Sequence, residues 1–339
     1  MYNLYSYEKK ENFNCEIKKE TEKGTYQKIL ISFESPFKTN IKINDLAYSE
    51  VFISKDKKTA PGDNLSNTLL VLLHGFASKK NRLNNYYAFI KNMLNNGLDC
   101  AFIHLPYHLS RTPAGQLSGQ KLIYTDDKET LEFFHQSVVD VKRFIDIAIK
   151  NIGYEKIVLC GFSLGSMISV ITAAIDNRIN KTILIFGGGN WHQIHWNSSL
   201  SYVLKGNCLQ DDIINRVKCR FLYKDFPVFC GELEKTDLDS LIRTGLCSHF
   251  ALKEKTIKQC FLCDPAAFAY RLKPGNTLML NCRFDHFFSK QSTLELWKNL
   301  GKPKIYWFNK LHSSRILANR KVLKIISNFI KDKPGYNET

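Results

Sequence analysis

The chain has 339 residues, of which 44% are hydrophobic, so it is long enough to bury the core of one large domain or of two smaller ones. Its formal net charge is +16, and Lys and Arg are enriched in residues 290–339. Within that segment they are spaced apart rather than clustered, and no nucleic-acid-binding motif accompanies them. We therefore expect a solvated basic face with at most weak contact to anionic surfaces, and no nucleic-acid partner.

The sequence also lacks the usual marks of a membrane or secreted protein. No stretch approaches about 18 consecutive apolar residues, and residues 1–10 contain no apolar signal core. The ten cysteines form no obvious disulfide framework, which favours reduced thiols in a cytoplasmic protein.

A cluster of cysteines raises the question of a metal. Cys247, His249, Cys260 and Cys263 offer four soft ligands for zinc. However, Cys-x-His stands where a pair of cysteines is usual, so buried, unligated thiols are the favoured interpretation. We expect no metal and no cofactor, with a zinc site as the alternative.

In chain order, the first 65 or so residues alternate β-branched with polar side chains, which predicts two to four antiparallel strands at the edge of a larger sheet. From residue 68 onward, short apolar runs alternate with segments of helical periodicity, which is typical of an α/β fold with a mostly parallel sheet. Strands are predicted at 68–73, 98–105, 157–160, 182–186, 277–282 and 304–308. Helices are predicted at 84–95, 129–150, 164–176, 290–299 and 316–330.

The run from residue 156 to 171 places Gly-Phe-Ser-Leu-Gly between a β-branched strand and an apolar helix. Strand, sharp turn and helix form the context that a nucleophile elbow requires, with Ser163 at its tip. Gly161 and Gly165 suit such a turn, because the serine adopts a strained conformation and neighbouring chains approach where a Cβ would collide. The pattern predicts a nucleophilic serine rather than an ordinary turn residue.

A serine hydroxyl needs a base to accept its proton and a carboxylate to orient that base. Asp285 and His312 each follow a predicted apolar strand, as Ser163 does, and the carboxyl ends of parallel strands meet at one edge of a sheet. We therefore expect these three residues to meet. His286 is the alternative base, and Asp264 is the alternative acid.

In this order of nucleophile, acid and histidine, the chain resembles the α/β-hydrolase superfamily over about residues 67–330. The resemblance implies the α/β-hydrolase fold, with helices on both faces of the sheet, and a triad of Ser163, His312 and Asp285. It also implies an oxyanion hole made by the backbone N–H groups of Phe76 and Leu164. The alternation of strands and helices fails over residues 190–263, where mixed helical pieces are expected, and this indicates an inserted cap over the site. The expected divisions are an N-terminal strand extension (1–66), a first part of the hydrolase core (67–189), the cap insertion (190–263) and a second part of the core (264–339).

Within the superfamily, the loop from Pro106 to Pro113 is similar to the abhydrolase-domain-18-like group, which implies no particular substrate. The residues expected to bind substrate are His74, Tyr107, His108, Arg111 and Trp191. The alternative for the first four is that they anchor the loops on which they lie. The alternative for Trp191 is that it belongs to the hydrophobic core of the cap. The sequence departs from the family at Leu311, where glycine often precedes the catalytic histidine.

These residues favour a serine hydrolase that cleaves a small carboxylic ester through an acyl-enzyme on Ser163. A thioesterase or a peptidase would use the same triad. Two alternative functions are not enzymatic. One is a catalytically inactive binding protein on the same fold, and the other is a protein that binds a membrane or a nucleic acid through its basic C-terminal part. The oligomeric state stays open.

Overall fold

The computed structural model describes residues 3–8, 14–55, 65–78, 83–123, 125–199, 212–246 and 259–332. Within these residues, nine strands form one sheet in the order β1-β2-β3-β5-β4-β6-β7-β8-β9. The strands are β1 (Cys15–Lys23), β2 (Tyr26–Glu34), β3 (Leu46–Ser54), β4 (Thr68–Leu73), β5 (Asp99–His104), β6 (Lys156–Phe162), β7 (Ile179–Ile185), β8 (Thr277–Phe284) and β9 (Lys304–Leu311).

The sheet has an antiparallel and a parallel part. Strands β1, β2 and β3 pair antiparallel with one another, and β3 pairs antiparallel with β5. From β5 to β9 every neighbouring pair is parallel. The predicted antiparallel extension on a mostly parallel sheet is confirmed, and all six strands predicted after residue 67 are present.

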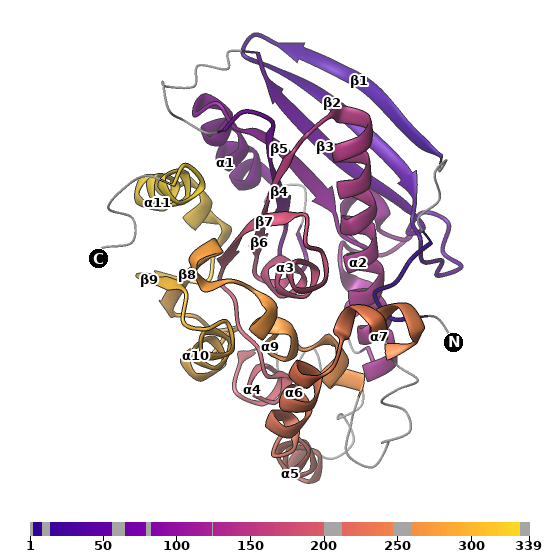
Figure 1. Ribbon diagram of the computed structural model, residues 1–339, viewed down its shortest axis with the longest axis vertical. Coiled ribbons are helices and arrows are strands. Elements are labelled where there is room, and N and C mark those ends of the chain that lie inside the picture. The colour runs from indigo at the N-terminus through magenta and orange to yellow at the C-terminus, as the bar shows by residue number, and fades with distance from the viewer. Residues whose placement is uncertain are drawn as a thin grey trace.

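Helices cover both faces of the parallel part. The main ones are α1 (Leu83–Asn95), α2 (Asp127–Ile147), α3 (Leu164–Ile175), α10 (Lys290–Asn299) and α11 (Arg320–Ile330). In Figure 1, α1 and α11 lie together on one side of the central strands and α2 lies on the other. All six side chains of β4 are therefore buried, which explains its continuous apolar sequence.

Local signals set the helix ends. A capping box begins α2: Asp126 Oδ1 accepts from the N–H of Glu129 at 2.7 Å, and the Glu129 carboxylate accepts from the N–H of Asp126 at 3.2 Å. The predicted helix over 316–330 is instead a 3₁₀ turn (Ser314–Ala318) followed by α11. The helix restarts there because Asn319 Oδ1 accepts from the N–H groups of Lys321 and Val322.

Between β7 and β8 the described residues are mainly helical, which agrees with the mixed helical pieces expected where the alternation fails. The segment between β7 and β8, called the insertion below, contains α4 (Trp191–Trp196), α5 (Asp212–Leu222), α6 (Phe226–Lys235) and α7 (Leu238–Thr244) within the range 190–263, and α9 (Pro265–Phe268) after it. In Figure 1, α5 and α6 lie at the end of the molecule opposite β1. Throughout the described ranges, no helix combines the length and the apolar character needed to cross a membrane.

Candidate active site

Ser163 occupies a sharp turn between the end of β6 and the start of α3. Its φ of 56° and ψ of −115° are strained for a residue with a Cβ. A Cβ on Gly161 would lie 2.2 Å from the carbonyl oxygen of Gly165, and a Cβ on Gly165 would lie 2.4 Å from that of Leu73. Both positions therefore require glycine because of close packing, as the sequence predicts.

Hydrogen bonds hold this elbow to β7. The N–H of Ser163 donates to the carbonyl of Ile185 at 2.8 Å, and the carbonyl of Ser163 accepts from the N–H of Ser166 at 2.8 Å. The Ser166 hydroxyl lies 2.7 Å from the Ser163 carbonyl oxygen and 3.1 Å from that of Phe186. The strained serine is thus fixed by its surroundings, and its side chain stays partly accessible, with 9% of the residue exposed.

Asp285 and His312 form a hydrogen-bonded pair at the ends of β8 and β9. His312 Nδ1 lies 2.8 Å from Asp285 Oδ2, and their side chains are 7% and 4% exposed. Asp285 Oδ1 accepts from the N–H groups of Phe287 and Phe288 at 2.8 and 2.9 Å, which orients the carboxylate. His286, the alternative base, is exposed, and its ring makes no contact with Asp285 in the described part of the chain.

Aromatic rings hold the His312 imidazole beside the elbow. Its ring centroid lies 5.6 Å from that of Phe162, which directly precedes Ser163, and 4.7 Å from that of Phe186. Phe287 packs edge-on against the imidazole at 4.7 Å. The acid–histidine pair and the elbow therefore share one corner of the sheet edge.

The loop after β4 lies directly against the elbow. A Cβ on Gly75 would stand 3.2 Å from the Ser163 Cβ and 2.9 Å from the Phe162 ring. Phe76 and Leu164, the expected oxyanion donors, line the same cavity as Ser163. Their backbone N–H groups donate to no acceptor among the residues that the structure describes, so they are available to a ligand.

Two buried histidines hold this loop. His108 Nε2 accepts from the N–H of Ala77 at 3.2 Å, and its Nδ1 lies 2.8 Å from the Pro106 carbonyl oxygen. His74 Nε2 accepts from the N–H of Leu105 at 3.1 Å, and its Nδ1 lies 2.8 Å from the Gly75 carbonyl oxygen. In each ring Nδ1 faces a carbonyl oxygen and Nε2 faces an N–H group, so the neutral ring carries its proton on Nδ1. Burial favours this neutral form, because it lowers the pKa of His108 to about 4 and that of His74 well below its usual range.

These contacts correct the expectation that His74 and His108 bind substrate. Both side chains are fully buried, and both nitrogens of each ring are occupied by backbone groups. They fix the position of Phe76 and its neighbours instead. Their contacts match the alternative stated from the sequence, in which these histidines anchor loops.

Arg111 and Tyr107 need the same correction. The Arg111 guanidinium is fully buried, pairs with Asp140 at 2.7 Å, and donates to the carbonyl groups of Asn44 and His104. Because all three guanidinium nitrogens donate to protein groups in the buried interior, the side chain is not available to bind a substrate anion. Tyr107 has a φ of 61°, donates its N–H to Asn44 Oδ1 at 2.7 Å, and is not among the residues that line the cavity at Ser163.

A narrow cavity of about 70 Å³ opens beside Ser163. Its walls come from α2, from α3 and from α4 of the insertion. Trp191, one of the predicted substrate-binding residues, is in this wall. Sequence reasoning missed the other walls, because nothing in the helical periodicity distinguishes cavity-lining apolar residues from core ones. These residues are Leu122, Thr125, Thr130, Phe133, Phe134, Met167, Ile194, His195 and Phe288.

Asp264, the alternative acid, has a structural role. Its carboxylate is fully buried and accepts from the N–H groups of Asn190 and Trp191, both at 2.9 Å, and from the Tyr223 hydroxyl at 3.2 Å. Burial raises its pKa to about 6. It contacts no histidine in the described ranges, and it holds the start of α4 in place.

Two of the four residues of the zinc alternative lie within the described part of the chain. Cys260 and Cys263 carry thiols whose pKa burial raises well above its usual range, whereas Cys247 and His249 lie outside the described residues. Over the described ranges, no group of three or more His, Cys, Asp or Glu side chains is arranged to hold a metal ion.

Comparisons with known proteins agree with the fold described above. A family model described as alpha/beta hydrolase fold matches residues 68–207. The "Uncharacterized protein YdjC" of Bacillus subtilis (strain 168) is 25% identical over 92 residues, which are 27% of this chain and 79% of that protein.

Solved structures are similar over nearly the whole chain. An acetyl xylan esterase from Paenibacillus sp. R4 matches with a TM-score of 0.61 at 14% identity, covering 95% of this chain and 89% of that one. Acetyl xylan esterase 1 from Thermoanaerobacterium sp. JW/SL YS485 matches with a TM-score of 0.53 at 13% identity, covering 95% and 88%. A cold-adapted esterase from an Arctic intertidal metagenomic library matches with a TM-score of 0.52 at 14% identity, covering 94% of this chain and 98% of that one. At these identities the likeness concerns the fold, and it confirms the fold that the sequence resemblance implied.

Proposed function

We propose that this chain is a serine hydrolase of the α/β-hydrolase superfamily that cleaves a carboxylic ester through an acyl-enzyme on Ser163. The observation that carries the proposal is the His312–Asp285 pair packed against Phe162, next to a serine held at positive φ. Such a pair beside a strained serine is the arrangement that activates a hydroxyl as a nucleophile. The esterase activity in the names of the similar structures supports the same reaction class.

In the proposed mechanism, Ser163 Oγ attacks the ester carbonyl carbon while His312 accepts the hydroxyl proton at Nε2. Asp285 keeps the Nδ1 proton of His312 facing the carboxylate and stabilises the imidazolium. The N–H groups of Phe76 and Leu164 donate to the oxyanion. The C–O bond of the leaving alcohol then breaks, and His312 gives its proton to the alkoxide.

Water completes the cycle. A water molecule loses a proton to His312 and attacks the acyl carbon, the bond to Ser163 Oγ breaks, and the proton returns to the serine oxygen. The products are an alcohol and a carboxylic acid. This sequence of steps uses only groups of the chain and water.

The cavity beside Ser163 suggests a short, uncharged acyl group. Its volume of about 70 Å³ is well below the several hundred Å³ typical of pockets for larger ligands, so it suits an acyl group of a few carbon atoms. Its described lining contains no Lys, Arg, Asp or Glu, so a charged acyl group would lose hydration without gaining an ionic partner.

The test is a series of p-nitrophenyl esters from acetate to dodecanoate. We expect the acetate and butyrate to be hydrolysed faster than the octanoate and dodecanoate, and Ser163→Ala to lose this activity. Ser327→Ala, which changes a partly buried serine on α11, serves as the control and should retain it. A folded wild type without activity on any ester in the series would contradict the proposal.

A further inference from the structure

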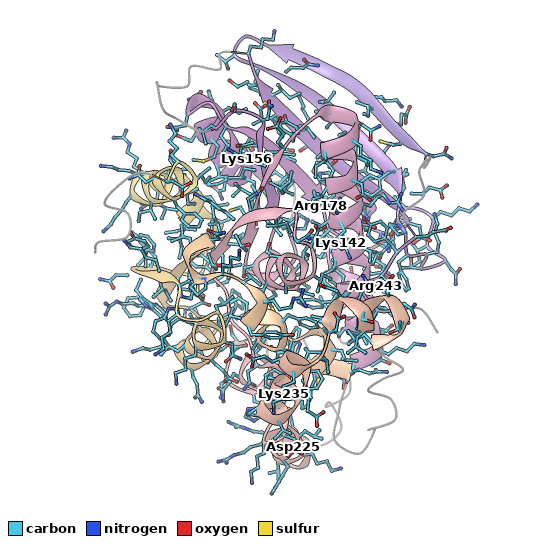
Figure 2. The ribbon with its side chains drawn as sticks, in the orientation of Figure 1. Lys142, Lys156, Arg178, Asp225, Lys235 and Arg243 are labelled. Atoms are coloured by element: carbon cyan, nitrogen blue, oxygen red, sulfur yellow. The ribbon has the colours of Figure 1, made fainter. Side chains whose placement is uncertain are left out.

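The N-terminal segment (residues 3–8) packs against both α2 and the insertion. Lys142 of α2 donates to the carbonyl of Tyr5 at 3.0 Å. Asn3 donates through its side chain to the carbonyl of Arg243, on α7, at 2.9 Å. Figure 2 labels Lys142 and Arg243, which lie near each other where the segment passes. The segment therefore joins a helix of the core to a helix of the insertion.

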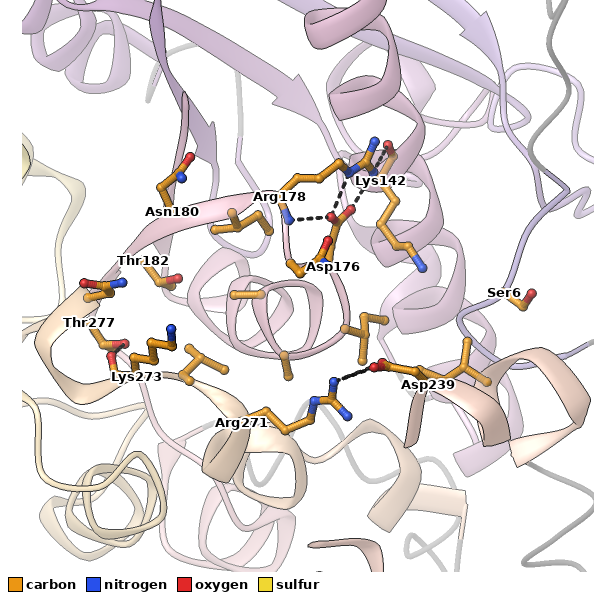
Figure 3. Close-up of a pocket in the computed structure, with 18 of the residues that line it drawn as sticks. Ser6, Lys142, Asp176, Arg178, Asn180, Thr182, Asp239, Arg271, Lys273 and Thr277 are labelled. Carbon is orange, nitrogen blue, oxygen red and sulfur yellow. Dashed lines mark hydrogen bonds and ion pairs between the residues drawn. The ribbon is translucent and has the colours of Figure 1, made fainter. Parts of the chain in front are cut away.

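The same three parts of the chain enclose a larger cavity, of about 800 Å³ (Figure 3). Ser6 of the N-terminal segment lines it together with Lys142 of α2 and Asp239 of α7. These residues are far apart in the sequence, so the cavity marks a junction between the segment, the core and the insertion. A displacement of the segment would reach both of the other parts.

Tyr5 makes the central contacts of this junction, and it is fully buried. Its N–H donates to His135 Nδ1, on α2, at 2.8 Å, and its hydroxyl donates to the carbonyl of Leu262 at 2.8 Å. Leu262 belongs to a 3₁₀ turn (Gln259–Cys263) of the insertion that packs against α2. The Tyr5 ring packs edge-on against Phe268 of α9 at 5.7 Å. A single residue thus ties α2 to the end of the insertion.

On the α2 side, the contact of Tyr5 lies next to a wall of the cavity beside Ser163. His135 directly follows Phe134 in the helix, and both Phe133 and Phe134 line that cavity. The His135 ring can accept the N–H of Tyr5 because burial keeps it neutral, with its pKa lowered to about 3. The hydrogen bond therefore holds the turn of α2 that carries the wall.

On the insertion side, Leu262 is followed by two residues that hold α4. The carbonyl of Cys263 accepts from Trp191 Nε1 at 3.4 Å. The carboxylate of Asp264 accepts from the N–H groups of Asn190 and Trp191, both at 2.9 Å. Because Trp191 lines the same small cavity, the Tyr5 hydroxyl is bonded to the stretch that fixes the second wall.

The two walls meet inside the cavity, where the ring of Phe134 packs edge-on against Trp191 at 5.7 Å. Tyr5 holds the first wall through the neighbour of Phe134 and the second through residues 262–264. In a close-packed cavity of only about 70 Å³, a small shift of either wall changes which groups fit.

We propose that Tyr5 is a positioning residue that holds the α2 wall and the α4 wall of the cavity beside Ser163 at the spacing that selects a short acyl group. Tyr5 is not among the residues that line this cavity, so it acts through its neighbours and does not touch substrate. The selection of the acyl group rests on the proposed function, whereas the spacing of the walls does not depend on any reaction.

The first test compares Tyr5→Phe with Tyr7→Phe by hydrogen exchange and mass spectrometry. Each change removes one phenol hydroxyl from the same segment and keeps the ring. Each also takes a donor from a buried acceptor, which is the Leu262 carbonyl for Tyr5 and the Asp146 carboxylate, at 2.6 Å, for Tyr7. Only the Tyr5 hydroxyl is linked to a wall of the small cavity, so Tyr7→Phe is the matched control. Circular dichroism checks that each variant is folded.

In Tyr5→Phe we expect the backbone amides of residues 190–196 to exchange about tenfold faster than in the wild type, because the stretch that holds the start of α4 is loosened. In Tyr7→Phe these amides should exchange at the wild-type rate. The amides of residues 320–330, in α11, report on global unfolding and should exchange alike in all three proteins. Equal rates for residues 190–196 in Tyr5→Phe and Tyr7→Phe would overturn the proposal.

The second test measures the ratio of kcat/KM for p-nitrophenyl octanoate to that for the acetate. A loosened wall admits longer chains, so the ratio should rise about threefold in Tyr5→Phe and stay unchanged in Tyr7→Phe. In a Trp191→Ala background the wall itself is removed. There Tyr5→Phe should change the ratio less than about 1.5-fold, because effects that act through a shared partner are not additive.

The two tests separate this inference from the proposed function. Faster exchange of residues 190–196 in Tyr5→Phe, in a protein that hydrolyses no ester, would support the positioning of the walls and contradict the proposed function. An active wild type whose ratio stays the same in Tyr5→Phe would contradict the role of Tyr5 in selecting the acyl group and leave the proposed function intact.

Discussion

The ring of His108 accepts a hydrogen bond from the backbone N–H of Ala77 across 3.2 Å, and this contact joins the loop after β5 to the loop after β4. The loop after β4 carries the Phe76 N–H that we propose as an oxyanion donor. Because the His108 side chain is fully buried, we propose that it positions Phe76 through this contact and does not touch substrate.

His108→Ala should lower kcat about 10- to 100-fold with little change in KM, because a small displacement of an oxyanion donor weakens transition-state binding far more than ground-state binding. His108→Gln retains an acceptor for the Ala77 N–H and should recover part of the loss. Steady-state kinetics on a short-chain ester measures both variants. A kcat unchanged in a folded His108→Ala protein would show that the contact has no role in catalysis.

Arg111→Met should destabilise the protein by about 3–5 kcal/mol, because it leaves the buried Asp140 carboxylate without its cation. The double variant Arg111→Met/Asp140→Leu removes both charges and should recover much of this stability. Urea unfolding measures the free energies. A raised KM together with unchanged stability would instead restore Arg111 as a substrate-binding residue.

Phe134→Ala should widen the cavity beside Ser163 and shift the preference toward longer acyl chains. The Phe134 ring lines this cavity and packs edge-on against Trp191 at 5.7 Å. We expect the ratio of kcat/KM for octanoate to that for acetate to rise about tenfold, since each added buried methylene contributes about 0.8 kcal/mol.

The matched control is Phe144→Ala, on the same helix. Phe144 is as deeply buried but does not line the cavity. Both variants should lose about 3–5 kcal/mol of stability, so the ratio of rates separates the two. An equal shift of the ratio in both would show that the cavity does not select the acyl group.

The free energy of unfolding should fall as the pH decreases from 7 to 5. Burial lowers the pKa of four histidines, to about 4 for His104 and His108, to about 3 for His135, and well below the usual range for His74. In the unfolded chain they bind protons near pH 6.5, whereas the folded protein does not, so acid favours the unfolded state. Asp264, whose pKa is raised to about 6, opposes this trend, and so do Asp140 and Glu295, whose pKa values burial also raises. Burial lowers the pKa of a fifth histidine, His192, which adds to the trend, so the histidines are in the majority.

Urea midpoints at pH 7, 6 and 5 and constant ionic strength measure this dependence. His135→Gln removes one of the four titrating groups and keeps an acceptor for the N–H of Tyr5, so its stability should vary less with pH. Stability that is constant or rises over this range would contradict the burial of neutral histidines.

Local patterns in the sequence predicted the strands, the elbow and the loops that carry Asp285 and His312. They succeed because local constraints determine these residues. A strand buried on both faces, such as β4, needs a continuous apolar run, and the close backbone contacts around Ser163 leave room only for glycine. The direction of a side chain in a long loop has no such local signal. The sequence is compatible with Arg111 either as an anion-binding residue or as a buried anchor. Only its contact with Asp140, on a helix distant in the sequence, distinguishes the two roles.

The two cavities were beyond prediction for a related reason. The wall beside Ser163 combines α2 with α4, and the larger cavity combines the N-terminal segment with α7 and the start of β8.

The most direct test of the account is labelling with a fluorophosphonate probe, with the adduct located by mass spectrometry. We predict stoichiometric labelling at Ser163 in the wild type, none in Ser163→Ala, and at least a hundredfold slower labelling in His312→Ala. Folded wild-type protein that remains unlabelled, or that is labelled equally fast in His312→Ala, would contradict the claim that His312 activates Ser163.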